Sequence, residues 1–288
     1  MSISLQEVTY IYMPKTPFEK AAIRNINLEI RQGEFVGIIG HTGSGKSTLV
    51  QHLNGLLKPA SGTVKIEGQD IHDKSAAAKA ARRRVGMVFQ YPEHQLFEES
   101  VYEDVAFGPR NLGIREEEVE TRVREALQFV GLDFDTFAKR TPFQLSGGQM
   151  RRVAIAGVIA LAPKYLILDE PSAGLDPRGR DEIFGQIMNL HQATGTTVVL
   201  VSHNMEDVAR MANRLIVMHN GEISLDGRPQ DIFSRHQAEL RQAGVDVPPV
   251  SMLMNQLLQR GLKVDNRIVD IEAAAQNIYE AVRRNESC

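Results

Sequence analysis

The sequence predicts an α/β fold, a mostly parallel sheet covered by helices, and two observations lead to that prediction. Short apolar runs that suit strands buried on both faces, at 35–39, 165–168 and 197–202, alternate with stretches whose apolar residues recur every three or four positions. Hydrophobic residues are 42% of the 288 residues, and 23 glycines bring the apolar share near the ordinary globular value, so the chain can bury a core. Ligands of such folds bind at the carboxyl ends of the strands.

The first part of the chain is expected to form strands before its first helix. Apolar residues alternate with polar ones from Ile26 to Ile30, as in a half-buried strand, and a turn at 31–33 leads to the buried strand 35–39. A glycine-rich loop follows, then leucines at helical spacing, until Lys58 and Pro59 end the pattern. The expected elements here are strands 3–12, 22–30 and 35–39 and a helix over 47–57.

The middle of the chain is expected to add a helical subdomain at roughly 95–160. From Glu116 to Val130 the apolar positions recur every three or four residues, which predicts an amphipathic helix, and a second helix is expected over 149–161. Before this subdomain we expect a short strand pair at 62–70, an alanine-rich helix at 75–81 and a strand at 85–89. After it, strands 165–168 and 197–202 are expected to end the core.

The composition changes at 244–249, and two helical stripes of apolar residues follow. The first consists of Val250, Leu253, Met254, Leu257 and Leu258 and ends at Gly261; the second consists of Ile268, Ile271, Ala275, Ile278 and Val282. Either these stripes pack a helical appendage on the body, or they contact a partner. We therefore divide the chain into a main domain, 1–244, and a C-terminal helical extension, 245–288.

The charge and the apolar pattern argue against two classes of protein. Thirty-three Lys and Arg against 36 Asp and Glu give a net charge of −3, the reverse of a nucleic-acid-binding surface. Two short basic clusters, 82–84 and 283–284, are interpreted as solvated faces. The longest near-continuous apolar stretch, 153–162, has ten residues, whereas a membrane-spanning helix needs about 20, so the chain is not expected to cross a bilayer.

The cellular compartment is predicted from the chain start and from cysteine usage. The first residues lack the pattern of a secretory signal peptide, and the one cysteine, Cys288, has no partner for an internal disulfide. A reducing cytoplasm fits both observations. Tryptophan is absent and aromatic residues are 6%, so we expect function to lie in local motifs rather than in an aromatic-lined surface.

Residues 40–47, with the sequence GHTGSGKS, fit the phosphate-binding pattern G-x-x-x-x-G-K-[ST]. Glycines let the backbone turn its N–H groups toward a polyphosphate, and the following helix presents its positive N-terminus to the same charge. Lys46 would reach the terminal phosphates, and the Ser47 hydroxyl would hold magnesium. The position between a buried strand and a helix argues against a glycine turn that binds nothing.

Asp169 and Glu170 lie side by side at the carboxyl end of an apolar strand. Adjacent residues there point in different directions, so the two carboxylates can hold different roles. Asp169 would bind magnesium through the water shell of the metal, and Glu170 could orient or deprotonate an attacking water. Without the upstream phosphate loop, the pair would as readily be two solvated acids.

Residues 145–149 have the sequence LSGGQ, and together with the other motifs they resemble the nucleotide-binding subunits of ABC transporters. Six motifs stand in that family's order: the phosphate loop, Gln90 after strand 85–89, LSGGQ, the segment 166–170, the segment 172–176, and His203 after strand 197–202. The resemblance implies a P-loop NTPase ABC ATPase core with an antiparallel β subdomain, an α-helical subdomain and a C-terminal helical extension.

The resemblance also implies ATP and Mg²⁺ as cofactors and a head-to-tail dimer that sandwiches two ATP molecules. Each phosphate loop would face the LSGGQ of the other subunit, formed here by Leu145, Ser146, Gly147, Gly148 and Gln149, whose N–H donors at a helix N-terminus suit a phosphate. Asp176 would cross the dimer interface. Tyr12 would stack on adenine, with Tyr10, on the same strand face, as the alternative. The implied ATP-binding residues are Tyr12, Gly40, Thr42, Gly43, Ser44, Gly45, Lys46, Ser47 and Thr48, with His41 contributing mainly its backbone.

The catalytic residues that the resemblance implies are Glu170, His203 and Gln90. His203 would hold the γ-phosphate and the catalytic water. Gln90 would sense magnesium and the attacking water while contacting the transmembrane partner. The implied magnesium ligands are Ser47, Gln90 and Asp169.

Two stretches, QYPEHQLF at 90–97 and DVAFGPRN at 104–111, are similar to the ATPases of energy-coupling factor importers and of their cobalt and nickel relatives. The sequence TPFE at 16–19 and the loop sequence GHTGSGKST are similar to the second ATPase paralogue of vitamin-importing complexes. This implies a heterodimer with a paralogous ATPase, a transmembrane coupling protein, interchangeable small membrane proteins that capture the vitamin, and no nucleic acid. The subunit would lie peripherally on the cytoplasmic face of the membrane, and its C-terminal extension would help to hold the two ATPases together.

Three alternatives stay open at this point: an ATPase of a cobalt or nickel importer, an ABC ATPase outside transport, and a regulatory subunit that clamps ATP without hydrolysing it. About 100 residues separate Lys46 from Ser146, too few for the coiled coil of DNA-repair members. A single phosphate loop does not fit the fused translation-factor members. The presence of Glu170, His203 and LSGGQ argues against the regulatory subunit.

Overall fold

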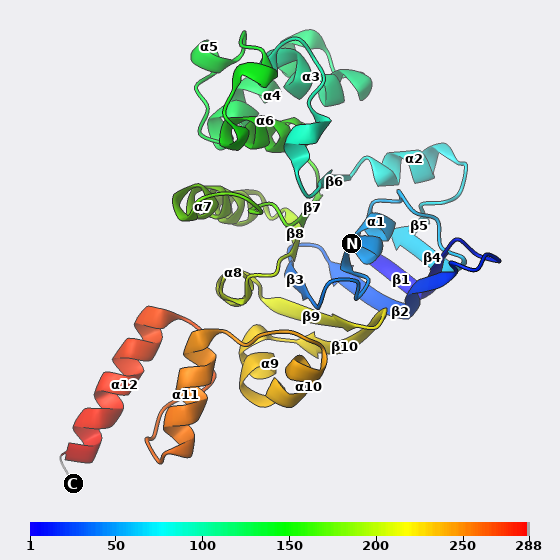
Figure 1. The fold of residues 1–288 in the computed structure, drawn as a ribbon. Helices are drawn as coiled ribbons and strands as arrows, with labels where there is room; N and C mark the ends of the chain where they lie inside the picture. The colour runs from blue at the N-terminus through cyan, green and yellow to red at the C-terminus, as the bar shows by residue number, and fades with distance from the viewer. Residues whose placement is uncertain (287–288) are drawn as a thin grey trace.

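A six-stranded mixed sheet forms the centre of the structure, a computed structural model that describes residues 1–286 (Figure 1). Its strand order is β10-β9-β3-β8-β7-β6, and all neighbours are parallel except β10 and β9. Every residue of β3, β7 and β8 is buried, as their apolar runs predict. The strands are β3 (Phe35–Ile39), β6 (Val85–Val88), β7 (Tyr165–Asp169), β8 (Thr197–Val201), β9 (Arg214–His219) and β10 (Glu222–Gly227).

β9 and β10 extend this sheet beyond the strands that the sequence analysis expected. The run Leu215–Met218 in β9 is fully buried, and Asn220 and Gly221, both at positive φ, make the turn to β10. Because β9 pairs with β3, the expectation that strand 197–202 ends the core is wrong.

A second, antiparallel sheet has the order β2-β1-β4-β5. Its strands are β1 (Ser2–Tyr12), β2 (Lys20–Arg31), β4 (Ser61–Ile66) and β5 (Gln69–Asp70). Alternate residues of β1 and β2, among them Ile3, Ile26 and Ile30, are buried in one apolar cluster with Ile38 of the central sheet. The two sheets therefore share a core, and the helix after the phosphate loop packs into it.

That helix, α1 (Lys46–Leu53), is shorter than the predicted 47–57. Its C-cap is Asn54, and Gly55 follows in the left-handed region at φ 79°, which stops the helix before Leu56 and Leu57. The alanine-rich helix α2 (Ala76–Arg82) begins at Ser75, whose side chain accepts a hydrogen bond from the Ala78 N–H.

Four helices form a separate layer beyond the β6 and β7 edge of the central sheet (Figure 1). The stripe predicted from Glu116 to Val130 is fully buried and packs against Val153 and its neighbours. The elements are α3 (Val101–Asn111), α4 (Glu116–Phe129), α5 (Phe134–Phe137) and α6 (Gly147–Ile159), with the short 3₁₀ turns η1 (Pro92–Gln95) and η2 (Pro142–Gln144).

The rest of the main domain consists of helices that connect and follow the central strands. They are α7 (Pro177–Thr194), α8 (Met205–Met211), α9 (Pro229–Arg235) and α10 (Gln237–Gln242). α7 lies between the helical layer and α8, and α9 and α10 lie beyond β9 and β10 (Figure 1).

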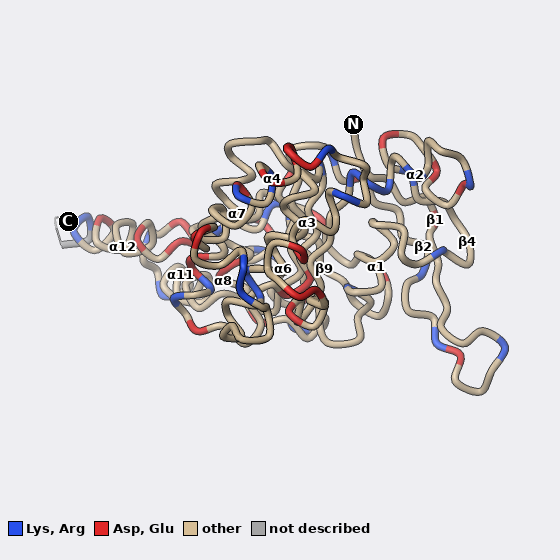
Figure 2. The backbone as a smooth tube through the Cα atoms, turned by 90° about the horizontal axis from the view of Figure 1, so that it is seen from above, with Lys and Arg blue, Asp and Glu red and all other residues tan. Residues whose placement is uncertain are grey.

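The C-terminal extension contains α11 (Pro249–Gln259) and α12 (Ile271–Glu286) and projects away from the body in both views (Figures 1 and 2). It has its own small apolar cluster around Met254, Val264, Ala274 and Ala281. Of the first predicted stripe only Met254 is buried. In both stripes other members face outward, Ile271 being 61% exposed. Cys288 lies outside the described residues.

Charged residues of both signs are interspersed along the chain (Figure 2). The basic cluster 82–84 is more structured than expected, because Arg82 donates to the Ile71 carbonyl and Arg84 pairs with Glu67. Within residues 1–286, every helix is too short or too polar to traverse a lipid bilayer.

Candidate functional site

The phosphate loop joins β3 to α1, and steric contacts require glycine at two of its positions. Gly40 and Gly45 have φ values of 154° and 104°. A Cβ on Gly40 would lie 2.3 Å from the Met218 carbonyl oxygen, and one on Gly45 would lie 2.6 Å from the Ala22 carbonyl oxygen. The backbone of β9 and β2 thus presses against the loop and fixes its shape, which only glycine permits.

The Lys46 side chain folds back over its own loop. Its Nζ donates to the carbonyl oxygens of Gly40 at 2.7 Å and of His41 at 3.0 Å, and the residue is 5% exposed. Burial lowers the pKa of Lys46, against the opposing influence of the Glu170 and Asp169 carboxylates. The ammonium group therefore stands at the loop with carbonyl partners that phosphate oxygens could replace.

Asp169 ends β7 beside the start of α1, where its carboxylate hydrogen-bonds with the Ser47 side chain. Burial raises the pKa of Asp169, and the Ser47 hydrogen bond acts in the opposite direction. Asp169 is 6% exposed and lies behind the loop. A hydroxyl and a carboxylate thus meet at the edge of the loop, in the arrangement expected of magnesium ligands beside a phosphate.

Glu170 adopts a left-handed backbone conformation at φ 53°, which costs a non-glycine residue about 1 kcal/mol or more. Its N–H donates to the Val201 carbonyl at 3.0 Å, which holds it in place. Gln90 Nε2 donates to Glu170 Oε2 at 3.2 Å, and His203 Nε2 lies 2.7 Å from Glu170 Oε1. The structure thus brings together the three residues expected to be catalytic.

A cavity of about 340 Å³ lies over the phosphate loop. Tyr12 lies at its wall, where its hydroxyl is 3.3 Å from Thr48 Oγ1, whereas Tyr10 packs between Tyr12 and the buried His52. Of the two candidate aromatics, Tyr12 is therefore the one that faces the cavity. The lining residues are Tyr12, Lys20, Ala22, Thr42, Gly43, Gly45, Lys46, Ser47, Thr48, Gln90, Glu170 and His203.

Two predicted loop residues do not line this cavity. Gly40 lies behind it, against β9, as the close approach to Met218 requires. Ser44 is fully buried, and its Oγ has no hydrogen-bond partner within residues 1–286. Its backbone N–H bonds the His41 carbonyl at 3.1 Å, so Ser44 shapes the turn of the loop from below.

LSGGQ forms the entrance to α6. Ser146 is the N-cap, its side chain accepts from the Gln149 N–H, and the Gln149 side chain accepts from the Ser146 N–H, a complete capping box. Leu145 is buried and anchors the turn, whereas a Cβ on Gly147 would meet no atom within 4 Å. The helix N-terminus is thus rigid, and its surface at Gly147 is open.

A second cavity, of about 480 Å³, includes Ser146, Gly148 and Gln149 together with Asp176. Asp176 caps α7, its Oδ1 accepting from the Gly179 N–H at 2.7 Å. In the part of the chain that the structure describes, this cavity shares no lining residue with the one over the phosphate loop. The chain does not bring its own LSGGQ to its own loop.

Comparison with known proteins identifies the family. Residues 23–173 match the family model described as ABC transporter. The chain is 53% identical to the energy-coupling factor transporter ATP-binding protein EcfA2 of Clostridium perfringens over 99% of this chain and 100% of that one. It is 49% identical to the protein of the same description from Clostridioides difficile over the full length of both. This chain belongs to the energy-coupling factor ATP-binding proteins of the ABC transporter family.

Solved structures place this energy-coupling factor ATP-binding protein in the same fold. The cbiO1 protein of Clostridium perfringens, described as part of the ABC transporter complex cbiONQ, superposes with a TM-score of 0.72 at 38% identity, covering 88% of this chain and 98% of that one. The ATP-binding cassette MJ0796, described as a dimeric post-hydrolysis state bound to ADP and Pi, gives 0.71 at 32% identity, covering 79% and 98%.

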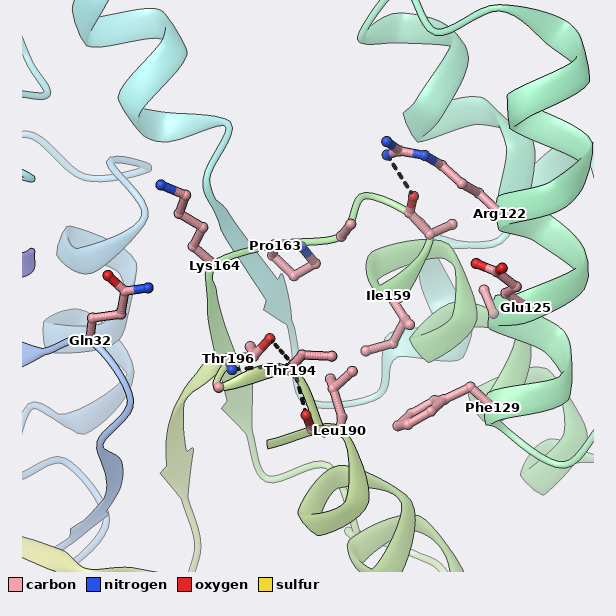
Figure 3. Close-up of a pocket in the computed structure, with 14 residues that line it drawn as sticks. Gln32, Arg122, Glu125, Phe129, Ile159, Pro163, Lys164, Leu190, Thr194 and Thr196 are labelled. Carbon is pink, nitrogen blue, oxygen red and sulfur yellow. Dashed lines mark hydrogen bonds between the residues drawn. The ribbon is translucent and has the colours of Figure 1, made fainter. Parts of the chain in front are cut away.

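Another cavity of the energy-coupling factor protein, of about 440 Å³, lies at the opposite, amino-terminal ends of β7 and β8 (Figure 3). Apolar side chains such as Ile159, Leu190 and Phe129 form its floor, and Lys164 and Arg122 stand at its rim. Both cations already have acidic partners, Glu67 and Glu118. It contains none of the motifs, so we assign the site to the loop cavity.

Sequence reasoning missed two features of the site region. Lys20, at the start of β2, lines the loop cavity, and only its place near Tyr12 in a hairpin could have indicated this. The buried Arg151 and the partly buried Glu93 form an ion pair between η1 and α6. No local pattern in the sequence signals this pair, because its members are 58 positions apart.

Proposed function

We propose that this chain binds and hydrolyses ATP as one half of an ATPase pair that powers import through membrane partners. The observation that supports the proposal most directly is the position of Glu170 between two polar side chains. One of its carboxylate oxygens contacts Gln90 and the other contacts His203, and all three residues line a cavity that Lys46 also lines. A carboxylate, an amide and an imidazole beside a phosphate-binding lysine form a water-activating constellation for phosphoryl transfer.

Binding begins with the loop. The loop N–H groups and the N-terminus of α1 attract the phosphates, and Lys46 exchanges its carbonyl partners for phosphate oxygens. Tyr12 offers a ring that is 40% exposed for stacking on the adenine. Thr48 meets the Tyr12 hydroxyl and thereby fixes the distance between the base site and the phosphate site.

Magnesium fits the residues present. Ser47 and Asp169 provide a hydroxyl and a carboxylate that already contact each other, and Mg²⁺ commonly takes one or two such protein ligands with phosphate oxygens and waters. Gln90 is the third group that we assign to it. When bound, the ion would neutralise charge that develops on the phosphates.

Hydrolysis needs a water aligned with the terminal phosphate. Glu170 accepts hydrogen bonds and is the group that would orient this water or take its proton, while Gln90 and His203 fix the direction of its two oxygens. His203 is half exposed toward the cavity, where its ring could also reach a phosphate oxygen. The rate gain comes from positioning and charge stabilisation rather than from covalent chemistry.

The second half of each site is proposed to come from another subunit. The open N-terminus of α6 at Ser146 and Gly147 suits a phosphate, yet its cavity is separate from the loop of the same chain. A head-to-tail pair would place each LSGGQ over the loop of the other subunit, with Asp176 at the junction. The preferred partner is a paralogous ATPase.

The import role follows from the family. The ATPase pair would sit peripherally on the cytoplasmic face of the membrane, where the segment after Gln90 would contact a transmembrane coupling protein and separate capture proteins would select a vitamin. One specific observation favours an alternative: the structural neighbour cbiO1 belongs to the cbiONQ complex. The TPFE segment and the phosphate-loop sequence are similar to those of vitamin importers, and they favour vitamin import over cobalt or nickel import.

The C-terminal extension is proposed to strengthen the ATPase pair. Leu253, Ile271 and Tyr279 are 47%, 61% and 53% exposed, although they belong to or flank the apolar stripes of α11 and α12. Apolar side chains gathered on a projecting segment typically mark an interaction site. Main domain 1–244 would then hydrolyse ATP, and 245–288 would hold the partner.

The test is affinity purification of the tagged chain from detergent-solubilised membranes, identification of the chains that copurify, and an ATPase assay of the complex. We expect a second ATPase and membrane proteins, with hydrolysis that requires Mg²⁺. A complex without ATPase activity, or a chain that shows no affinity for Mg-ATP in titration calorimetry, would overturn the proposal. Loading proteoliposomes with labelled vitamins, or with Co²⁺ or Ni²⁺, would then separate the two transport readings.

A further inference from the structure

Arg151 belongs to none of the motifs, yet it contacts two of the segments that carry them. It lies in α6 two residues after Gln149, and its side chain is 4% exposed. Two of its nitrogens bind the Glu93 carboxylate, Nε to Oε2 at 3.1 Å and Nη2 to Oε1 at 2.9 Å. The third, Nη1, donates to the Ala173 carbonyl oxygen. The whole guanidinium group is therefore occupied.

The partners of Arg151 lie close to the catalytic residues. Glu93 is three residues after Gln90, in η1, and the Tyr91 ring centroid lies 5.9 Å from the guanidinium carbon. Ala173 is three residues after Glu170, and its N–H donates to the Glu170 carbonyl at 3.1 Å. One side chain thus joins the Gln90 segment, the LSGGQ helix and the turn that holds Glu170.

The charges and the paired hydrogen bonds of Arg151 and Glu93 favour one fixed orientation of the two side chains. Burial raises the pKa of Glu93, but the hydrogen bond and charge of Arg151, together with a backbone hydrogen bond and the nearby His94, hold that pKa below its usual range, so the pair stays ionised. A planar guanidinium bound to a carboxylate through two parallel bonds permits one relative orientation, which a lysine cannot impose. A buried ion pair commonly adds little stability over apolar residues of similar size, so a role in positioning is the better explanation of its place here.

We propose that Arg151 is a positioning residue that holds the N-terminus of α6 and the Gln90 segment in one fixed relation. When the Gln90 segment moves against a membrane partner, the LSGGQ turn moves with it toward the nucleotide of the other subunit. This inference rests on the proposed function, because it needs LSGGQ to act on a nucleotide bound by a second chain.

The test compares Glu93→Leu, Arg151→Met and the double variant in the complex copurified with its membrane partners. Each single variant leaves a buried or partly buried charge without its partner and should lower Tm. The double variant removes both charges and should recover Tm to within about 2 °C of wild type. Its kcat for ATP hydrolysis should nevertheless stay at least about tenfold below wild type, with KM for ATP within about twofold. A residue that only stabilises the fold would recover kcat together with Tm.

Two further variants complete the design. Arg151→Lys keeps the charge but loses the paired bonds, and we expect kcat to fall at unchanged KM. The matched control is Arg122→Met with Glu118→Leu, an ion pair of 2.8 Å within α4, for which kcat should equal wild type. A double Glu93→Leu and Arg151→Met variant with wild-type kcat, or an Arg151→Lys variant with wild-type kcat, would overturn the inference. A wild-type complex that hydrolyses no ATP would overturn the proposed function and this inference with it.

Discussion

His203 Nε2 lies 2.7 Å from Glu170 Oε1. The other oxygen of the same carboxylate accepts from Gln90 Nε2 at 3.2 Å. The three residues follow β8, β7 and β6, which are neighbouring parallel strands, so their carboxyl ends meet at one edge of the sheet. The carboxylate is therefore oriented by side chains from both flanking strands.

Glu170→Gln should stop ATP turnover while leaving Mg-ATP binding intact. The amide keeps the size of the side chain but cannot take a proton from water, so hydrolysis should fall by at least about 100-fold. The variant should accumulate as an ATP-bound closed pair, measured by size-exclusion chromatography with ATP and by phosphate release. Undiminished phosphate release would reject the role of Glu170.

Lys46→Ala should weaken nucleotide binding. The ammonium group is buried against the loop and would contact phosphate, so its loss should reduce affinity for Mg-ATP by about tenfold or more, measured by titration calorimetry. Lys20→Ala is the matched control, because Lys20 lines the same cavity on its exposed side. Equal losses in the two variants would contradict a specific role for Lys46.

Gly40→Ala should disrupt the loop more than a glycine substitution that meets no neighbour. The added Cβ would lie 2.3 Å from the Met218 carbonyl oxygen, whereas Gly33→Ala, at φ 81°, meets nothing within 4 Å. Gly33→Ala should cost about 1 kcal/mol of unfolding free energy from its backbone alone. Gly40→Ala should cost more and also abolish Mg-ATP binding, as urea denaturation and calorimetry would show; similar behaviour of the two variants would be evidence against a steric requirement.

His52→Phe should reduce the loss of stability at acidic pH. His52 is fully buried, and burial lowers its pKa from the ordinary 6.5, with the nearby His72 acting in the same direction and the Thr48 carbonyl bond against it. Below pH 6.5 the unfolded chain therefore binds a proton that the folded chain does not. The free energy of unfolding should fall as the pH drops from 6.5 toward the folded pKa, by at most about 1.4 kcal/mol per pH unit.

Phenylalanine preserves a ring for the edge-on contact with Tyr10, whose centroid lies 5.0 Å away, and it does not titrate. Urea denaturation of wild type and His52→Phe at pH 7.5, 6.5 and 5.5 measures the two slopes. Parallel slopes would mean that His52 does not cause the acid sensitivity.

Leu253→Ser combined with Tyr279→Ser should weaken the ATPase pair without unfolding the extension, because both side chains are about half exposed. Met254→Ala provides the contrast. Met254 is fully buried in the cluster of the extension, so its truncation should cost about 2–5 kcal/mol of local stability. Analytical ultracentrifugation measures the association of the two ATPase subunits, and hydrogen exchange measures the local stability of α11 and α12. Unchanged association in the double serine variant would contradict the proposed contact.

The elements that could be predicted from the sequence are those whose own residues show a clear local pattern. The phosphate loop, β3, β7 and β8 were recognisable because apolar runs and glycines carry their own physical requirements. The run Leu215–Met218, which forms β9, is an apolar run of the same kind. The order of the strands, which brings Gln90, Glu170 and His203 together, depends on long-range pairing that no local pattern encodes.

The stripes of the extension illustrate a second limit. Periodicity identified two helices, but it could not tell which apolar side chains would be covered, and Ala274 is buried while Ala275 is exposed. Val245 and Val247, at the start of the extension, are buried in the main core. Its two helices instead pack on each other, and α11 also contacts α9, so only a few side chains of each stripe are covered. The Glu93 and Arg151 pair was missed for a related reason, since two charged residues 58 positions apart have no local signature.

The separation of the loop cavity from the LSGGQ cavity on one chain has a genetic consequence. Two defective alleles, one altered at Lys46 and one at Ser146, would damage opposite halves of a shared centre. In a pair of identical chains, coexpression of the two alleles would regenerate one undamaged centre and restore part of the growth phenotype. In a pair with a paralogue, the two alleles would never meet, and no such rescue would occur.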